Sequence, residues 1–120
     1  MNPTYAVLLL VAIACEVAAT GMLKATDGLT RVRPLAGVGA GYALAFVLLA
    51  LVLKRAPVGP VYAVWAGLGT AGAALVGRAA YGDRLSPVGW AGIALVVAGV
   101  VLLGLCGQPN EPPPPPTSAG

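Results

Sequence analysis

The sequence predicts an all-α membrane protein with four transmembrane helices, and three observations support this fold class. Hydrophobic residues make up 58% of the 120 residues and charged residues only 9%, with a mean hydropathy of +0.88. A soluble domain of this length could not bury so much apolar surface, because small domains leave much of their surface exposed. Four apolar segments each have close to the roughly 20 residues that cross a bilayer. Most of the charged residues fall between these segments.

We expect the four transmembrane helices at residues Pro3–Leu23, Leu35–Leu53, Val58–Ala80 and Pro87–Cys106. The stretches between them, KATDGLTRVRP, KRAP and YGDRLSP, are short, polar and rich in turn-forming residues, which favours hairpin connections. The first segment has no basic region before it and no clear cleavage pattern after it. It is therefore predicted to remain as a helix and not to be removed as a signal peptide.

Residues 1–106 thus form the predicted four-helix transmembrane domain, and residues 107–120 form a tail, GQPNEPPPPPTSAG. The five consecutive prolines of the tail favour an extended polyproline conformation, and no residues there could build a core. We expect a disordered, solvated extension. A proline-rich docking peptide is the alternative.

Several functional classes find little support in the composition. The net charge is +3, and no basic cluster alternates with aromatic residues, so a nucleic-acid partner is not expected. Cys15 and Cys106 lack metal-ligand spacing and lie in apolar runs, which favours small buried residues over a metal site or a disulfide. The chain has no histidine, and its serines lie in a connector and the tail, so neither an enzyme nor a cofactor is expected.

Glu16 is the acidic residue that falls well inside a predicted span, in the stretch LLLVAIACEVAATGMLK. A charged acid at the centre of a membrane helix costs roughly 2.5 to 3.5 kcal/mol, so such residues are usually functional. Because the chain has no histidine, Glu16 is the main candidate to bind and release protons within the membrane. The alternative is a structural role, with a protonated carboxyl group hydrogen-bonded to a neighbouring helix.

Residues around Glu16 and in the next two spans are candidates for a cation site. Ala12 and Thr20 lie four residues on either side of Glu16 and so share its helix face. The second span contributes Tyr42 and Phe46, and the third contributes Tyr62 and Trp65. Each aromatic residue alone could serve packing. Together with an ionisable acid they suit a lipophilic cation, which gains from charge attraction and from cation–π contacts.

Glycines inside the spans indicate close helix packing, because small residues let helix backbones approach in lipid. Gly37 and Gly41 are four residues apart in the second span, and Gly92 and Gly99 are seven apart in the fourth. This spacing fits packing within one four-helix bundle and fits dimerisation through the fourth span equally well.

The stretches ACEVAATGMLKATDGLTR, PVGPVYAVWAGLG and YGDRLSP resemble the small multidrug resistance family of bacterial proton-coupled cation exporters, and the resemblance spans about residues 2 to 106. It implies that Glu16 binds either a proton or the cationic substrate. It also implies that the following residues surround that site: Ala12, Ala19, Thr20, Tyr42, Phe46, Tyr62 and Trp65. By the same resemblance, Gly67 and Gly69 act as a conformational hinge, and Gly92 and Gly99 form a dimer contact.

The resemblance further implies an antiparallel dimer in the bacterial cytoplasmic membrane, as a homodimer or with a paralogous subunit. The implied function is proton-coupled antiport that exports lipophilic or quaternary ammonium cations. The alternatives are an exporter of small guanidinium-like cations, or a non-transporting membrane subunit in which Glu16 is structural. Three residues depart from the family pattern and leave the substrate range open: Pro60, Ala66 and Arg78.

Lysine and arginine are distributed unevenly between the two ends of the predicted bundle. Five lie in or beside the first and third connectors: Lys24, Arg31, Arg33, Arg78 and Arg84. The second connector has only Lys54 and Arg55. Because basic residues in short loops favour the cytoplasm, the chain is predicted to insert with a bias toward both termini outside.

Overall fold

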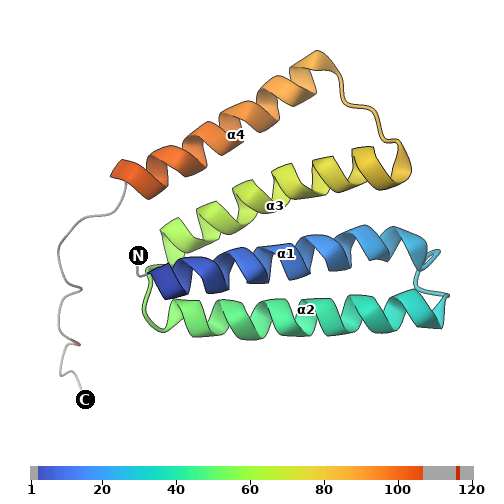
Figure 1. Cartoon of the computed structure of the whole chain (residues 1–120), viewed down its shortest axis with the longest axis horizontal. Coiled ribbons are helices and arrows are strands. Elements are labelled where there is room, and N and C mark those ends of the chain that lie inside the picture. The colour runs from blue at the N-terminus through green and yellow to red at the C-terminus, as the bar shows by residue number, and fades with distance from the viewer. Residues whose placement is uncertain (1–2, 107–115, 117–120) are drawn as a thin grey trace.

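The computed structural model describes residues 3–106 and residue 116, and it contains four helices in sequence (Figure 1). The helices are α1 (Pro3–Ala25), α2 (Val32–Leu53), α3 (Val58–Tyr81) and α4 (Pro87–Cys106). Each is long and apolar enough to cross a membrane, and the described residues contain no strand. The predicted all-α fold with four membrane spans is therefore confirmed. The predicted disordered tail lies, apart from residue 116, outside the described residues.

The helix ends differ from the predicted ends by at most three residues, and proline explains the largest difference. We expected the second helix to start after Pro34, but α2 begins at Val32. Proline is tolerated in the first turn of a helix because its missing N–H would have no helical partner there. Pro60 occupies a similar position in α3, which begins at Val58 as predicted. At its other end α3 ends at Tyr81 and is capped by Gly82, whose φ of 68° is the left-handed conformation that glycine adopts readily.

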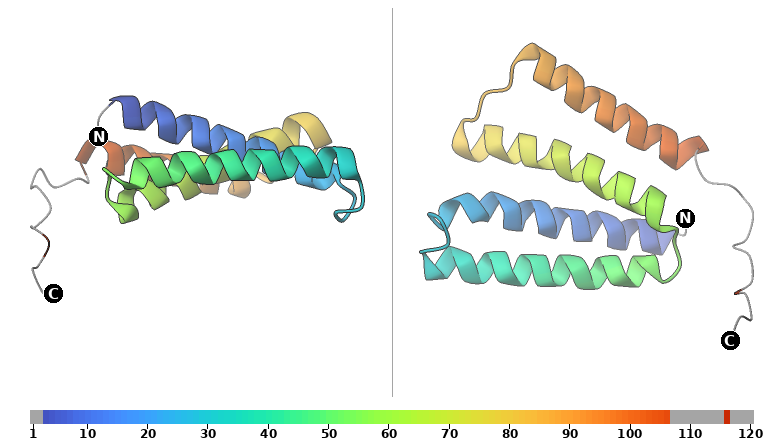
Figure 2. Two further views of the ribbon diagram at one scale, coloured as in Figure 1. Left: turned by 90° about the horizontal axis from the view of Figure 1, so that it is seen from below. Right: turned by 180° about the vertical axis from the view of Figure 1, so that it is seen from behind.

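The helices lie side by side in the order α2, α1, α3, α4, as Figures 1 and 2 show. The buried core sits between the first three helices. It joins Leu9, Ile13 and Val17 of α1 to Val52 of α2 and Val61 of α3. Helix α4 packs mainly against α3, and none of its described side chains is buried. Its apolar surface is therefore free to face lipid or a second protein.

Glycines on α2 allow it to approach α1 closely. A methyl group at Gly41 would stand 2.9 Å from the Cβ of Ala19, and one at Gly37 would collide with Met22. Gly37 and Gly41 therefore pack within the bundle. A methyl group at Gly92 or Gly99 of α4 would meet nothing within 4 Å. The dimer contact assigned to these two glycines stays a prediction.

Candidate functional site

The carboxylate of Glu16 is half-buried in the middle of α1, where it faces α3. Thr20, one turn further along α1, donates a hydrogen bond from Oγ1 to Oε1 of Glu16 over 3.1 Å. The other oxygen, Oε2, lies 3.3 Å from the position that a methyl group at Gly69 would occupy. Within residues 3–106, no lysine or arginine forms an ion pair with Glu16. A negative charge on Glu16 is therefore left without a cationic partner from this chain.

Thr20 also connects the acid to α2. Its Oγ1 lies 2.6 Å from the hydroxyl oxygen of Tyr42. A threonine hydroxyl has a single hydrogen, which Thr20 donates to Glu16, so Tyr42 is the donor in this second hydrogen bond. The two bonds form a chain: Tyr42 donates to Thr20, and Thr20 donates to the Glu16 carboxylate.

A stack of aromatic rings extends from Tyr42 of α2 to Trp65 of α3. The ring of Phe46 stacks with that of Tyr42 at a centroid distance of 6.4 Å and an interplanar angle of 20°. On its other side, Phe46 stacks with Trp65 at 6.4 Å and 13°. Phe46 is 58% exposed, so the stack is open to its surroundings. Such ring faces attract cations through their quadrupoles. Two helices, α2 and α3, therefore supply a stack of aromatic rings that is joined to Glu16 of α1 through Tyr42 and Thr20.

Three of the expected site residues lie apart from this arrangement. Tyr62 is 67% exposed and has no ring contact with the other described residues, although it is one turn before Trp65. Ala12 and Ala19 are fully buried within the bundle, and Ala19 lies against Gly41. The alanines thus set the packing of α1 against its neighbours within a single chain.

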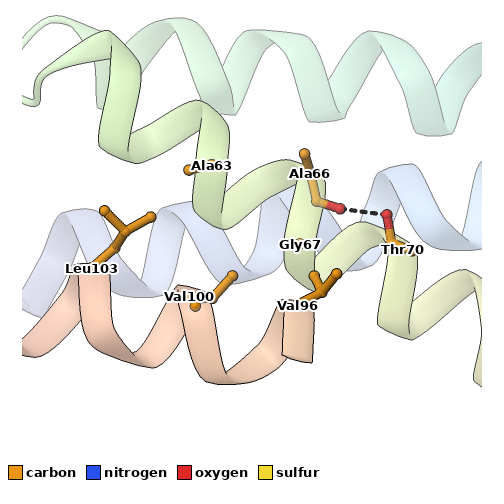
Figure 3. Close-up of a pocket in the computed structure, with 8 residues that line it drawn as sticks. Ala63, Ala66, Gly67, Thr70, Val96, Val100 and Leu103 are labelled. Carbon is orange, nitrogen blue, oxygen red and sulfur yellow. Dashed lines mark hydrogen bonds between the residues drawn. The ribbon is translucent and has the colours of Figure 1, made fainter. Parts of the chain in front are cut away.

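The expected hinge glycines are both buried in α3, which runs as one continuous helix through Gly67 and Gly69. Gly67 faces α4, where an added methyl group would collide with Val100. The contact borders a pocket of about 560 Å³ between α3 and α4 (Figure 3), and its lining contains no charged residue. Thr70 lies at the edge of this pocket and donates its hydroxyl hydrogen to the carbonyl of Ala66 over 2.6 Å. This pocket does not include Glu16, so it is separate from the acid site.

A polar cluster at the C-terminal ends of α1 and α3 was not expected from the sequence. Tyr81 donates a hydrogen bond to the carbonyl oxygen of Gly21 over 2.6 Å. Lys24 forms an ion pair with Asp83 at 3.6 Å, and its ammonium lies 4.8 Å from the centre of the Tyr81 ring. These residues border a pocket of about 130 Å³ that also reaches Thr20. The sequence could have indicated this cluster, because antiparallel spans place the end of α1 and the α3–α4 connector together, and these carry the opposite charges of Lys24 and Asp83.

A known protein family matches most of the chain, including the residues around Glu16. A family model described as Small Multidrug Resistance protein matches residues 4–96, which include Glu16 and the aromatic residues around it. The chain belongs to the small multidrug resistance family. With its four membrane-spanning helices, it is a multi-pass protein of the bacterial cytoplasmic membrane.

Individual members of the small multidrug resistance family are similar to the chain over most of their length. The multidrug transporter PA4990 of Pseudomonas aeruginosa is 48% identical over 97 residues, which cover 81% of this chain and 88% of the relative. The nicotine metabolites export pump subunit NepA of Paenarthrobacter nicotinovorans is 49% identical over 98 residues, 82% of this chain and 84% of the relative. The quaternary ammonium compound-resistance protein QacE of Escherichia coli is 45% identical over 97 residues, 81% and 88% of the two chains.

Proposed function

We propose that the chain is a proton-coupled antiporter that exports lipophilic or quaternary ammonium cations across the cytoplasmic membrane. The observation that carries this proposal is the Glu16 carboxylate, which has no cationic partner in residues 3–106 and is connected to a stack of three aromatic rings. The names of the relatives, which refer to multidrug transport and quaternary ammonium resistance, support the same substrate class.

Exchange follows from the fact that a proton and a cation compete for one carboxyl group. The ionised group accepts the hydrogen bond from Thr20 and attracts a cation, whose apolar groups gain contact with the rings of Phe46 and Trp65. A proton on Glu16 removes this attraction and releases the cation. If the cation-bound site and the proton-bound site can each open to either side of the membrane, cation export is coupled to proton entry.

A second copy of the chain, or a paralogous subunit, would complete the site as an antiparallel dimer. In a single chain the rings of Phe46 and Tyr62 are more than half exposed, and α4 presents an apolar surface with open space at Gly92 and Gly99. A dimer would cover such surfaces and would bring two Glu16 carboxylates to a shared cavity. The relative NepA is itself named as a pump subunit, which supports assembly with a partner.

Transport explains these residues better than catalysis does. Within the described part of the chain, no group of histidine, cysteine, aspartate or glutamate residues could hold a metal ion. Glu16 is also not paired there with a base or a nucleophile. We therefore assign Glu16 to binding and exchange, and not to bond making.

The experiment is proton release from the purified protein in detergent when a cation is added. Tetraphenylphosphonium should displace protons from the wild type, whereas guanidinium should release few, which separates the two substrate classes. Glu16→Gln should assemble but release no protons. Asp83→Asn, which removes an exposed carboxylate, is the matched control and should behave as the wild type.

Two results would count against the proposal. Wild-type proton release from Glu16→Gln would exclude Glu16 as the exchanged group. Loss of assembly in Glu16→Gln would favour the structural role of a non-transporting subunit.

A further inference from the structure

A second polar pocket lies at the end of the bundle where α1 begins and α2 ends. Its volume is about 400 Å³. It is lined by Thr4, Tyr5 and Leu8 of α1, by Leu51 of α2, and by Lys54 and Arg55 of the following connector. In Figure 1 this is the end with the N-terminus and the α2–α3 connector, away from the connectors that hold Asp27 and Asp83.

The pocket carries positive charge that no carboxylate of the described residues neutralises. Lys54 and Arg55 are both exposed, and neither forms an ion pair within residues 3–106. At the opposite end, by contrast, Lys24 pairs with Asp83 at 3.6 Å. The first turn of α1 adds to the positive potential, because the aligned peptide dipoles of a helix leave partial positive charge at its N-terminus.

The lining changes from polar to apolar with depth in the membrane. Thr4, Lys54 and Arg55 lie at helix ends, which is the level of the membrane interface. Leu8 follows Thr4 by four residues and Leu51 precedes Arg55 by four, so both lie about 6 Å deeper along their helices. The pocket therefore offers two cations at its rim and aliphatic side chains deeper in the membrane.

We propose that this pocket binds the phosphate group of an anionic phospholipid. Two cations that form no ion pair within residues 3–106 favour a headgroup with net negative charge, such as phosphatidylglycerol, over a zwitterionic headgroup that also carries an ammonium. Tyr5 also lines the pocket and carries a hydroxyl group that can donate a hydrogen bond. Leu8 and Leu51 extend the site toward the acyl chains, so the ligand is a lipid and not free phosphate. This site is independent of the proposed transport function.

The test is native mass spectrometry of the purified full chain with equal amounts of phosphatidylglycerol and phosphatidylcholine that have identical acyl chains. The wild type should retain phosphatidylglycerol preferentially. Lys54→Gln/Arg55→Gln should lose roughly 30-fold of this preference, from about 1 kcal/mol for each basic residue and 1.4 kcal/mol for each factor of ten. The matched control is Arg31→Gln/Arg33→Gln, which removes two exposed cations from the other end and should keep the preference.

A charge-conserving variant and a competing anion complete the test. Lys54→Arg/Arg55→Lys keeps both charges and should bind as the wild type, which shows that the pocket is folded. Equal losses in the two glutamine pairs would overturn the proposal in favour of general surface charge. Displacement of the lipid by inorganic phosphate would overturn it in favour of a free anion.

Discussion

Gly69 of α3 faces the Glu16 carboxylate of α1 across the helix interface and leaves room for it. The carboxylate oxygen Oε2 lies 3.3 Å from the position of a methyl group at residue 69, which is closer than most side chains approach a Cβ. Only a residue without a side chain leaves the carboxylate its present position. We therefore expect Gly69 to keep space for the Glu16 carboxylate, in addition to the hinge that the family resemblance implies.

Gly69→Ala is expected to weaken cation binding while the protein stays folded. The added methyl group must displace the Glu16 carboxylate slightly, and an overpacking cost of about 1 kcal/mol corresponds to a roughly five-fold lower affinity. Gly72→Ala is the control, because its methyl group would meet Val17 at 3.1 Å and no polar group. Both variants gain the same helix propensity. Isothermal titration with tetraphenylphosphonium measures the difference, and equal affinities of the two variants would exclude a specific role for Gly69.

The elements of the fold could be predicted well because the membrane fixes their length and composition. Charges and prolines mark the ends of each span, so three of the four helices begin where the sequence indicated. The exception is α2, whose start at Val32 was missed because proline can end a helix or occupy its first turn.

The contacts between helices could be predicted only in part. Spacing predicted that Thr20 shares a helix face with Glu16, and in the structure the two side chains form a hydrogen bond that the spacing alone did not specify. Spacing could not show which face of α2 meets that face of α1, so the bond between Thr20 and Tyr42 was not foreseen. The stacking of Phe46 on Trp65 depends in the same way on how the helices are rotated about their axes.

Trp65→Ala is expected to weaken the binding of planar aromatic cations by about 1 to 2 kcal/mol, the magnitude of a desolvated cation–π contact. The ring of Trp65 ends the stack that begins at Tyr42. Trp90→Ala is the matched control, since Trp90 lies on α4 and has no ring contact with the other described residues. Titration with several such cations checks both. Unchanged affinity in Trp65→Ala would assign this residue to packing alone.

Thr26→Val is expected to destabilise the protein by about 1 to 3 kcal/mol, because it removes two partly buried hydrogen bonds of a buried side chain with little change of shape. Thr26 is fully buried, and its Oγ1 donates to the carbonyl of Leu23 over 2.6 Å and accepts from the amide of Leu29 over 3.0 Å. Leu29, whose amide donates to Thr26, has a left-handed φ of 72°. Thr30→Val removes hydroxyl bonds at an exposed position and should cost less. Thermal unfolding in detergent compares the two, and equal costs would show that burial of Thr26 is unimportant.

Gly99→Leu is expected to weaken the dimer while the single chain folds. Gly99 lines the pocket between α3 and α4, and a methyl group there would meet nothing within 4 Å, so the leucine can be accommodated until a partner packs on this side of α4. Gly39→Leu places the same side chain in equally open space on α2 and should leave the dimer intact. Cross-linking in membranes measures both. An intact dimer with Gly99→Leu would show that this face of α4 is not the interface.

The orientation of the chain in the membrane is expected to be biased toward both termini outside. The helices alternate in direction, so the α1–α2 and α3–α4 connectors lie at one end of the bundle (Figure 1). Five basic residues lie in or beside these connectors, whereas the α2–α3 connector at the other end has two. The pairing of Lys24 with Asp83 does not alter this count, because acidic residues contribute little to orientation.

A topology reporter fused to Gly120, with the chain expressed alone, measures this bias. The wild type should give mostly external signal. Arg31→Gln/Arg33→Gln leaves three basic residues against two, so its signal should become nearly equal on the two sides. A biased chain can form an antiparallel dimer only with a minority of inverted copies or with a paralogous subunit of opposite bias. Equal signal from the wild type would contradict the bias, and it would mean that one chain supplies both orientations of the dimer.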